Sequence, residues 1–147
     1  MTLIFRPAKL IAPCLLALIA ACSPSGPPLT ATDIVAVAPL PGRKFSAAYL
    51  TIHNDSKETI AIHRVSSPDF AKVEIHESLI DKDIIQMRRL ESIIIDAGMS
   101  EKFESGGKHL MLIEPIPGLV AGKSITLQFE YNGDGMLIVT TVLINRE

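Results

Sequence analysis

The residues of this chain best suited to chemistry are two histidines and two methionines, His76, Met87, His109 and Met111. They follow the spacing His-x10-Met-x21-His-x-Met. Two imidazoles and two thioethers form a soft, uncharged ligand set, and Cu(I) is the metal ion that prefers such a set. A thioether has no proton to lose and forms no disulfide, so these ligands can hold copper where a thiolate would be oxidised. The quartet therefore predicts a binding site for one Cu(I) ion.

The segments that must position these four residues have the pattern of short β-strands. They are rich in Ile, Val, Leu and Thr, and turn residues separate them. Asn132-Gly133-Asp134-Gly135, between two alternating runs, is typical of a β-hairpin. After Ala21 no window of helical length carries an apolar stripe. We therefore expect an all-β fold, an antiparallel β-sandwich. The expected strands are Ser46–His53, Thr59–Val65, Lys72–Leu79, Ile84–Leu90, Ser92–Ile95, His109–Ile113, Ser124–Tyr131 and Met136–Ile144.

Strand geometry alone would present His109 and Met111 together. They lie two positions apart on an expected strand, so their side chains leave the same face. Leu110 and Leu112 then point the other way, into the core. The remaining histidines, at positions 53 and 63, lack a soft partner at strand spacing and are interpreted as surface residues. The methionines at positions 99 and 136 are interpreted as core filler.

His76 and Met87 need a hairpin to meet. If the chain turns around Asp81-Lys82, His76 lies directly opposite Met87, with about 5 Å between their Cβ atoms. The same register places Glu74 opposite Arg89, an opposite-charge pair. A slip of one residue would send Met87 to the other face of the sheet.

The N-terminus has the features of a bacterial export signal. Arg6 and Lys9 precede an apolar run, Leu10–Ala21, that is too short to cross a bilayer as a helix. Small residues then lead into Cys22, as in a lipoprotein signal. We expect residues 1–21 to be removed and Cys22 to be acylated; an ordinary signal peptide cut near the same alanines is the alternative. Ser23 favours an outer-membrane destination.

Three segments follow from this interpretation. Residues 1–21 are the lipoprotein signal peptide, residues 22–33 hold the lipidated Cys22 and a Pro/Ser-rich tether, and residues 34–147 form the copper-binding β-sandwich domain. The domain then contains no thiol. Without residues 1–21 the chain has 12 basic and 16 acidic residues, so no positive surface for nucleic acid is expected.

The quartet and its flanking strings resemble the periplasmic copper(I) chaperones of the PCuAC family. The strings are Ala48–Ile52, Val73–Glu77 and His109–Leu112, and the resemblance runs from about Ala47 to Leu143. It implies a cupredoxin-like, Greek-key β-sandwich and a link to loading copper into the CuA centre of cytochrome c oxidase. Many relatives carry a further Met where this chain has Ile113, which puts a second copper site in doubt.

The leading hypothesis is a periplasmic Cu(I) chaperone for this CuA centre. We expect a monomer on the periplasmic side of the envelope that touches the membrane only through its lipid. Its partner would be the copper subunit of a respiratory oxidase or an assembly factor of that oxidase. A copper buffer or resistance lipoprotein without a dedicated acceptor, and an anchored interaction module without metal, are the alternatives.

An enzyme is not expected. The chain has no His-Glu-x-x-His helix, no phosphate-binding glycine loop, no thiol nucleophile in the domain, and no convincing Ser-His-Asp arrangement. A blue-copper centre would need a Cys thiolate. A Zn(II) site could use the two histidines, but the methionines would be poor partners.

Overall fold

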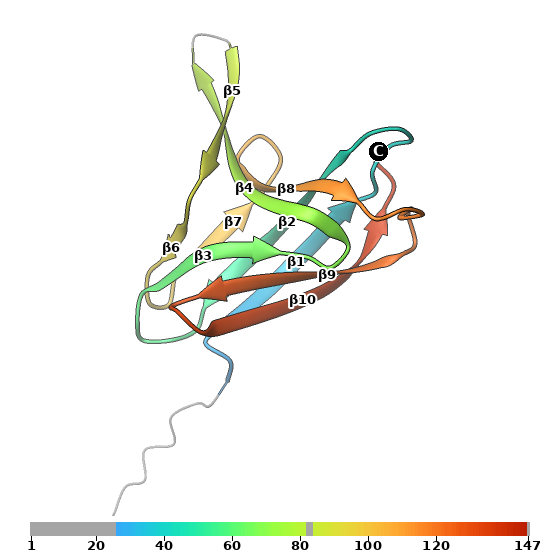
Figure 1. Ribbon diagram of the computed structural model, residues 1–147. Helices are drawn as coiled ribbons and strands as arrows, with labels where there is room; N and C mark the ends of the chain where they lie inside the picture. The colour runs from blue at the N-terminus through green and yellow to red at the C-terminus, as the bar shows by residue number, and fades with distance from the viewer. Residues whose placement is uncertain (1–25, 82–83, 147) are drawn as a thin grey trace, which may run out of the picture.

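The computed structural model of the protein describes residues 26–81 and 84–146. The expected signal peptide, residues 1–21, and Cys22 lie outside this range. Ten β-strands form its regular structure (Figure 1). They are β1 (Leu29–Val37), β2 (Phe45–Asn54), β3 (Ile60–Ser66), β4 (Phe70–Asp81), β5 (Ile84–Leu90), β6 (Ile93–Ile95), β7 (Ser100–Phe103), β8 (Lys108–Pro115), β9 (Ser124–Tyr131) and β10 (Gly135–Ile144). Over these residues we find no helix with the length and apolar character that crossing a membrane requires.

The strands form one hydrogen-bonded path that rolls into two layers. Its order is β5-β4-β8-β2-β1-β10-β9-β3-β6, and β7 pairs with β2. In Figure 1, β3, β9 and β10 lie in front of β1, β2 and β7. β1 and β10 are parallel, and the other pairings between described strands are antiparallel. Neighbours that are distant in sequence, such as β8 with β2, give the Greek-key character, and the predicted all-β sandwich is confirmed.

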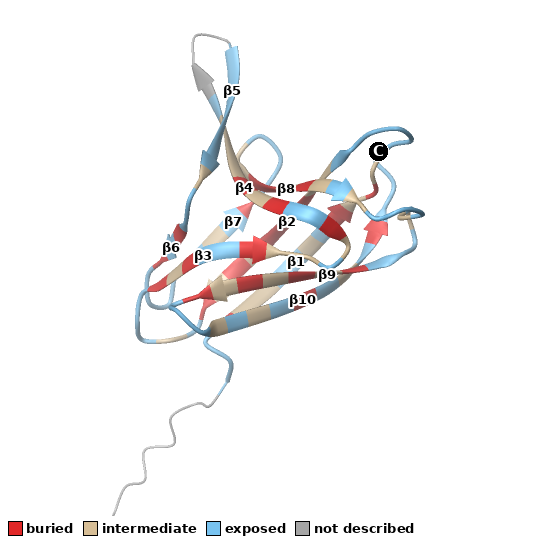
Figure 2. Ribbon diagram, in the orientation of Figure 1, coloured by how far each residue is buried: buried red, intermediate tan, exposed pale blue. Residues whose placement is uncertain are grey.

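The core lies between the two layers, because alternate residues of each strand point inward. On β9, Ile125, Leu127 and Phe129 are buried, and on β2, Leu50 and Ile52 face them from the other layer. Figure 2 shows this alternation as red bands along the strands. Burial of one such side chain contributes about 1.5–3 kcal/mol relative to exposure. This core anchors β4 and β8, which carry His76, His109 and Met111, whereas β5, which carries Met87, is almost wholly exposed.

The domain begins earlier than the expected residue 34. β1 starts at Leu29, which is only 1% exposed, so residues 29–33 belong to the sheet rather than to a tether. The sequence hid this strand because it contains a bulge between Thr32 and Val35, where Asp33 has a φ of 52°. The bulge breaks the period-two pattern that predicts a strand. β7 was missed for another reason: it has four residues, mostly polar, which are too few to show that pattern.

The hairpin of β4 and β5 projects from the body of the sandwich (Figure 1), and its register differs from the expected one. The observed pairs are Asp81 with Ile84, Ser78 with Met87, and His76 with Arg89. The prediction that His76 lies directly opposite Met87 is therefore wrong by two residues. A shift of two residues keeps side chains on their original face, since the strand period is two. His76 and Met87 thus remain on the same face, as diagonal neighbours.

Candidate metal centre

Two histidines meet across the pairing of β4 with β8. His76 lies directly opposite His109, and their ring centroids are 6.0 Å apart at an interplanar angle of 52°. His109 is 9% exposed, and the side chain of His76 is 14% exposed. Sequence reasoning placed each histidine on a strand but did not pair these two strands. The sheet therefore brings the imidazoles together by a route that differs from the predicted hairpin.

The hydrogen bonding of His76 leaves one ring nitrogen free. Nε2 lies 2.8 Å from Oε2 of Glu74. An ionised carboxylate can only accept, so we assign the ring proton to Nε2. Nδ1 then keeps its lone pair, and it is buried without a hydrogen-bond partner among the described residues. Leaving a buried acceptor unsatisfied is costly, and a metal ion is a partner that would satisfy it.

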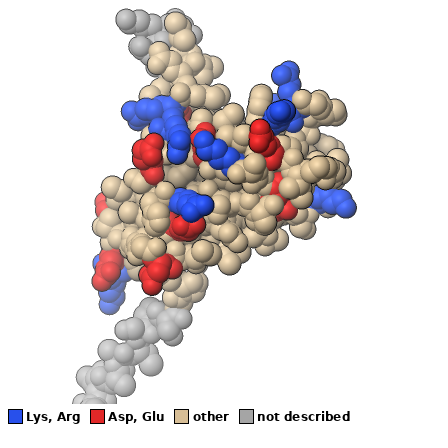
Figure 3. All heavy atoms as spheres, viewed as in Figure 1, with Lys and Arg blue, Asp and Glu red and all other residues tan. Residues whose placement is uncertain are grey.

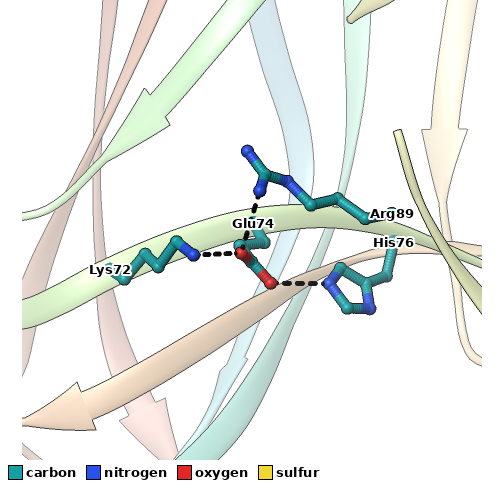
Figure 4. Close-up of polar contacts among 4 residues, drawn as sticks. All are labelled: Lys72, Glu74, His76 and Arg89. Carbon is teal, nitrogen blue, oxygen red and sulfur yellow. Dashed lines mark hydrogen bonds and ion pairs between the residues drawn. The ribbon is translucent and has the colours of Figure 1, made fainter. Parts of the chain in front are cut away.

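Glu74 is itself held by two cations from the same sheet (Figure 4). Its Oε1 lies 2.5 Å from Nζ of Lys72 and 3.5 Å from a guanidinium nitrogen of Arg89. The hydrogen bond from Lys72, followed by the one from His76, lowers the pKa of the Glu74 carboxyl below its ordinary value. Glu74 is therefore a fixed, ionised acceptor for the His76 ring. The sequence pointed only to the Glu74–Arg89 pair, which forms along the diagonal.

His109 is oriented by the backbone. Its Nδ1 lies 3.1 Å from the carbonyl oxygen of Gly107, two residues earlier. A carbonyl accepts, so Nδ1 carries the proton and Nε2 keeps the lone pair. Hydrogen bonds of this kind to a carboxylate or carbonyl are the usual support of metal-binding histidines. The two rings thus offer different donor atoms, Nδ1 of His76 and Nε2 of His109.

The two methionines line an open groove together with His109. Met111 follows His109 on β8 and pairs with Glu74 on β4. Met87 comes from β5 and is 64% exposed. The groove has a volume of about 610 Å³, and it contains Met87, His109 and Met111 in its wall. His76 is not part of this wall, and its ring centroid lies 6.0 Å from that of His109.

The other histidines have local partners. The ring nitrogens of His53 lie 2.8 Å from Oγ1 of Thr32 and 2.7 Å from Oγ of Ser100. His63 faces Glu130 at 4.0 Å. Neither lies in the groove. Within residues 26–81 and 84–146, no three His, Cys, Asp or Glu side chains gather as a metal-binding group, so a site here would depend on the methionine sulfurs.

Met99 and Met136 differ from the expectation of core filler. Both are exposed at the surface. Met99 is held in a turn by a backbone hydrogen bond to Asp96, and Met136 is the second residue of β10 and is exposed. Neither lines the groove of Met87 and Met111.

The fold is that of PCuAC domains, which confirms the cupredoxin-like class that the resemblance implied. The copper-bound PCuAC domain from PmoF2 matches with a TM-score of 0.66 at 17% identity, over 81% of this chain and 94% of that one. The Cu(I) form of DR1885 from Deinococcus radiodurans matches with a TM-score of 0.54 at 21% identity, over 83% and 80%. The chain belongs to the family described as "Putative lipoprotein LpqE-like", whose model matches residues 29–142.

A relative in sequence is protein RP573 of Rickettsia prowazekii (strain Madrid E). It is 26% identical over 101 residues, which make up 68% of this chain and 56% of that protein. The chain thus spans little more than half the length of this relative.

Proposed function

We propose that this protein carries one Cu(I) ion, held by His76, Met87, His109 and Met111. The observation that carries the proposal is the buried Nδ1 of His76, which has no hydrogen-bond partner among the described residues and belongs to a ring whose centroid lies 6.0 Å from that of His109. Two thioethers in the adjoining groove supply the soft ligands that Cu(I) prefers. Two structures with this fold, the PCuAC domain from PmoF2 bound to copper and DR1885 bound to Cu(I), are in accord with the proposal.

The groove also suits release of the ion. Met87 is 64% exposed on a projecting hairpin, so a ligand from a partner can approach the same ion. Neutral thioethers hold copper less tightly than thiolates do, and exchange of one ligand for another is a route for transfer. The ion is then a cargo, and the protein is a chaperone rather than an enzyme.

The acceptor we infer is the CuA centre of cytochrome c oxidase, reached directly or through an assembly factor. We further infer export to the periplasmic side of the envelope and acylation of Cys22, with an outer-membrane location and a monomeric state. Membership of a family of proposed lipoproteins supports the lipid anchor. Mass spectrometry of the protein from membranes, compared with a Cys22→Ala variant, tests the acylation.

Competition with a Cu(I) chelator tests the ligands. Removal of a partner that holds a metal ligand typically weakens metal binding by about 10–100-fold, so the loss of a ligand in Met87→Ala or Met111→Ala should weaken it at least as much. Met99→Ala and Met136→Ala are matched controls, because they remove exposed methionines that do not line the groove. Equal affinity in all four variants would refute the assignment. X-ray absorption on the loaded protein should report both nitrogen and sulfur neighbours.

A copper buffer without a dedicated acceptor would share this site. Oxidase activity in a deletion strain grown at low copper separates the two functions. Delivery predicts a loss of oxidase activity that copper supplementation restores, whereas a buffer predicts normal activity and greater copper sensitivity.

A further inference from the structure

The charged side chains in the described wall of the groove are of one sign. Apart from His109, the charged or titratable side chains along its described wall are Arg43, Arg146 and the phenol of Tyr49, and no acidic side chain is among them. Both guanidiniums are exposed, and neither forms an ion pair with a described residue. Arginines elsewhere differ: Arg64 and Arg88 each lie within 3.6 Å of a glutamate oxygen. The two groove arginines are therefore available to an outside anion.

This positive rim stands out because the chain as a whole is acidic, with a formal charge of −2. In Figure 3, Lys and Arg atoms lie near the place where Figure 1 marks the C-terminus, and Asp and Glu atoms lie next to them, although none of these carboxylates is part of the groove wall. A Cu(I) ion bound by four neutral ligands keeps its own positive charge. Loading would thus add to the positive potential of the groove, and such a surface attracts negatively charged partners.

Apolar side chains complete the same surface. Leu40, Phe45 and Met87 line the groove, and each is exposed. Apolar contact area with arginine at its margin is the composition of protein–protein interfaces. We define the groove rim as Leu40, Arg43, Phe45, Met87 and Arg146.

We propose that the groove rim docks the copper acceptor through a carboxylate-rich segment of that protein. Its carboxylates would pair with Arg43 and Arg146, a geometry that guanidinium and carboxylate favour, while its apolar residues cover Leu40 and Phe45. Docking there places the ligands of the partner next to the exposed Met87. This inference rests on the proposed function, because the partner is taken to be the copper acceptor. Binding of an acidic segment to the groove rim can nevertheless be tested without copper.

Two synthetic peptides provide the probe. Both peptides have an identical central segment that contains methionines and one histidine. In one peptide four Glu residues flank this segment, and in the other four Lys residues flank it. We expect the Glu-flanked peptide to shift the NMR signals of the groove rim in the copper-free protein. The double variant R43Q/R146Q should weaken this binding about fivefold, since each exposed ion pair contributes only modestly. High salt should remove the difference.

The matched control is K57Q/R64Q, which removes two exposed cations that do not line the groove. It should leave binding of the Glu-flanked peptide unchanged. Equal binding of both peptides, or equal loss in both double variants, overturns the docking proposal even if copper binds. Stopped-flow transfer of Cu(I) from the loaded protein should also be faster to the Glu-flanked peptide, and R43Q/R146Q should remove that advantage. A wild-type protein that binds no Cu(I) would overturn the proposed function, while the titration of the copper-free protein would still decide the docking surface.

Discussion

Replacing Glu74 should weaken copper binding although Glu74 is not a proposed ligand. Its carboxylate accepts the Nε2 hydrogen of His76 at 2.8 Å and thereby leaves the lone pair on Nδ1, the nitrogen that we propose as the ligand atom. A hydrogen bond to a charged group contributes about 1.5–3 kcal/mol, which corresponds to about 10–100-fold in a dissociation constant. We expect a loss of this size in Glu74→Ala. Lys72 and Arg89 would remain as uncompensated cations beside the metal ion, which acts in the same direction.

Glu74→Gln should have a smaller effect, because the amide oxygen still accepts from Nε2. The difference between a charged and a neutral hydrogen bond, about 1 kcal/mol, gives about a fivefold loss. Chelator competition measures the affinities, and ¹⁵N NMR of the copper-free protein reports which ring nitrogen of His76 carries the proton. Glu77→Gln is the control, since Glu77 pairs with Arg88 at 2.7 Å from the same two strands. If Glu74→Ala kept both the Nε2 proton and the wild-type affinity, the reasoning would be refuted.

Three other predictions concern pH and packing. Copper affinity, followed by chelator competition, should fall as the solution is acidified, because protons compete with the metal for imidazole nitrogens but not for thioethers; an affinity that stays constant from neutral to acidic pH would contradict imidazole ligation. Because the folded-state pKa of Glu74 is lowered from 4.5, its ion pairs stabilise the fold above that pH and lose this effect as pH falls through the folded-state pKa. Urea unfolding should therefore show a stability gap between wild type and Glu74→Gln at neutral pH that closes in acid, and a gap independent of pH would be inconsistent with this. Gly135→Ala should lower the free energy of unfolding by about 1–3 kcal/mol, since its methyl group would overlap the ring of Tyr131; an unchanged denaturation midpoint would show that the ring can move aside.

The sequence predicted the parts of the site that depend on local geometry. His109 and Met111 lie two apart on β8, and the strand period alone places them on one face. The hairpin of β4 and β5 was predicted with the correct second strand, but its register was wrong by two residues. Register depends on where the turn closes, and the pairing of Asp81 with Ile84 could not be derived from composition.

The contact between His76 and His109 could not be predicted, because β4 and β8 are distant in sequence and their pairing is set by the whole fold. The role of Glu74 did leave a signal. Lys72, Glu74 and His76 alternate along one strand, so they share a face. A charged pair beside a candidate ligand on the same face is a feature that sequence reasoning could have used.

The direction of β1 affects how far the groove of a lipid-anchored protein can lie from the membrane. Leu29 begins this strand at one end of the sandwich, and Val37, at its other end, lines the groove. Nine residues of strand span about 30 Å. With Cys22 acylated as proposed, residues 22–28 could add up to about 23 Å between lipid and domain. With these residues extended and the strand pointing away from the bilayer, the groove would lie up to about 50 Å from the lipid. Such a carrier would present its ion to proteins across the periplasmic gap more readily than to neighbours in its own membrane.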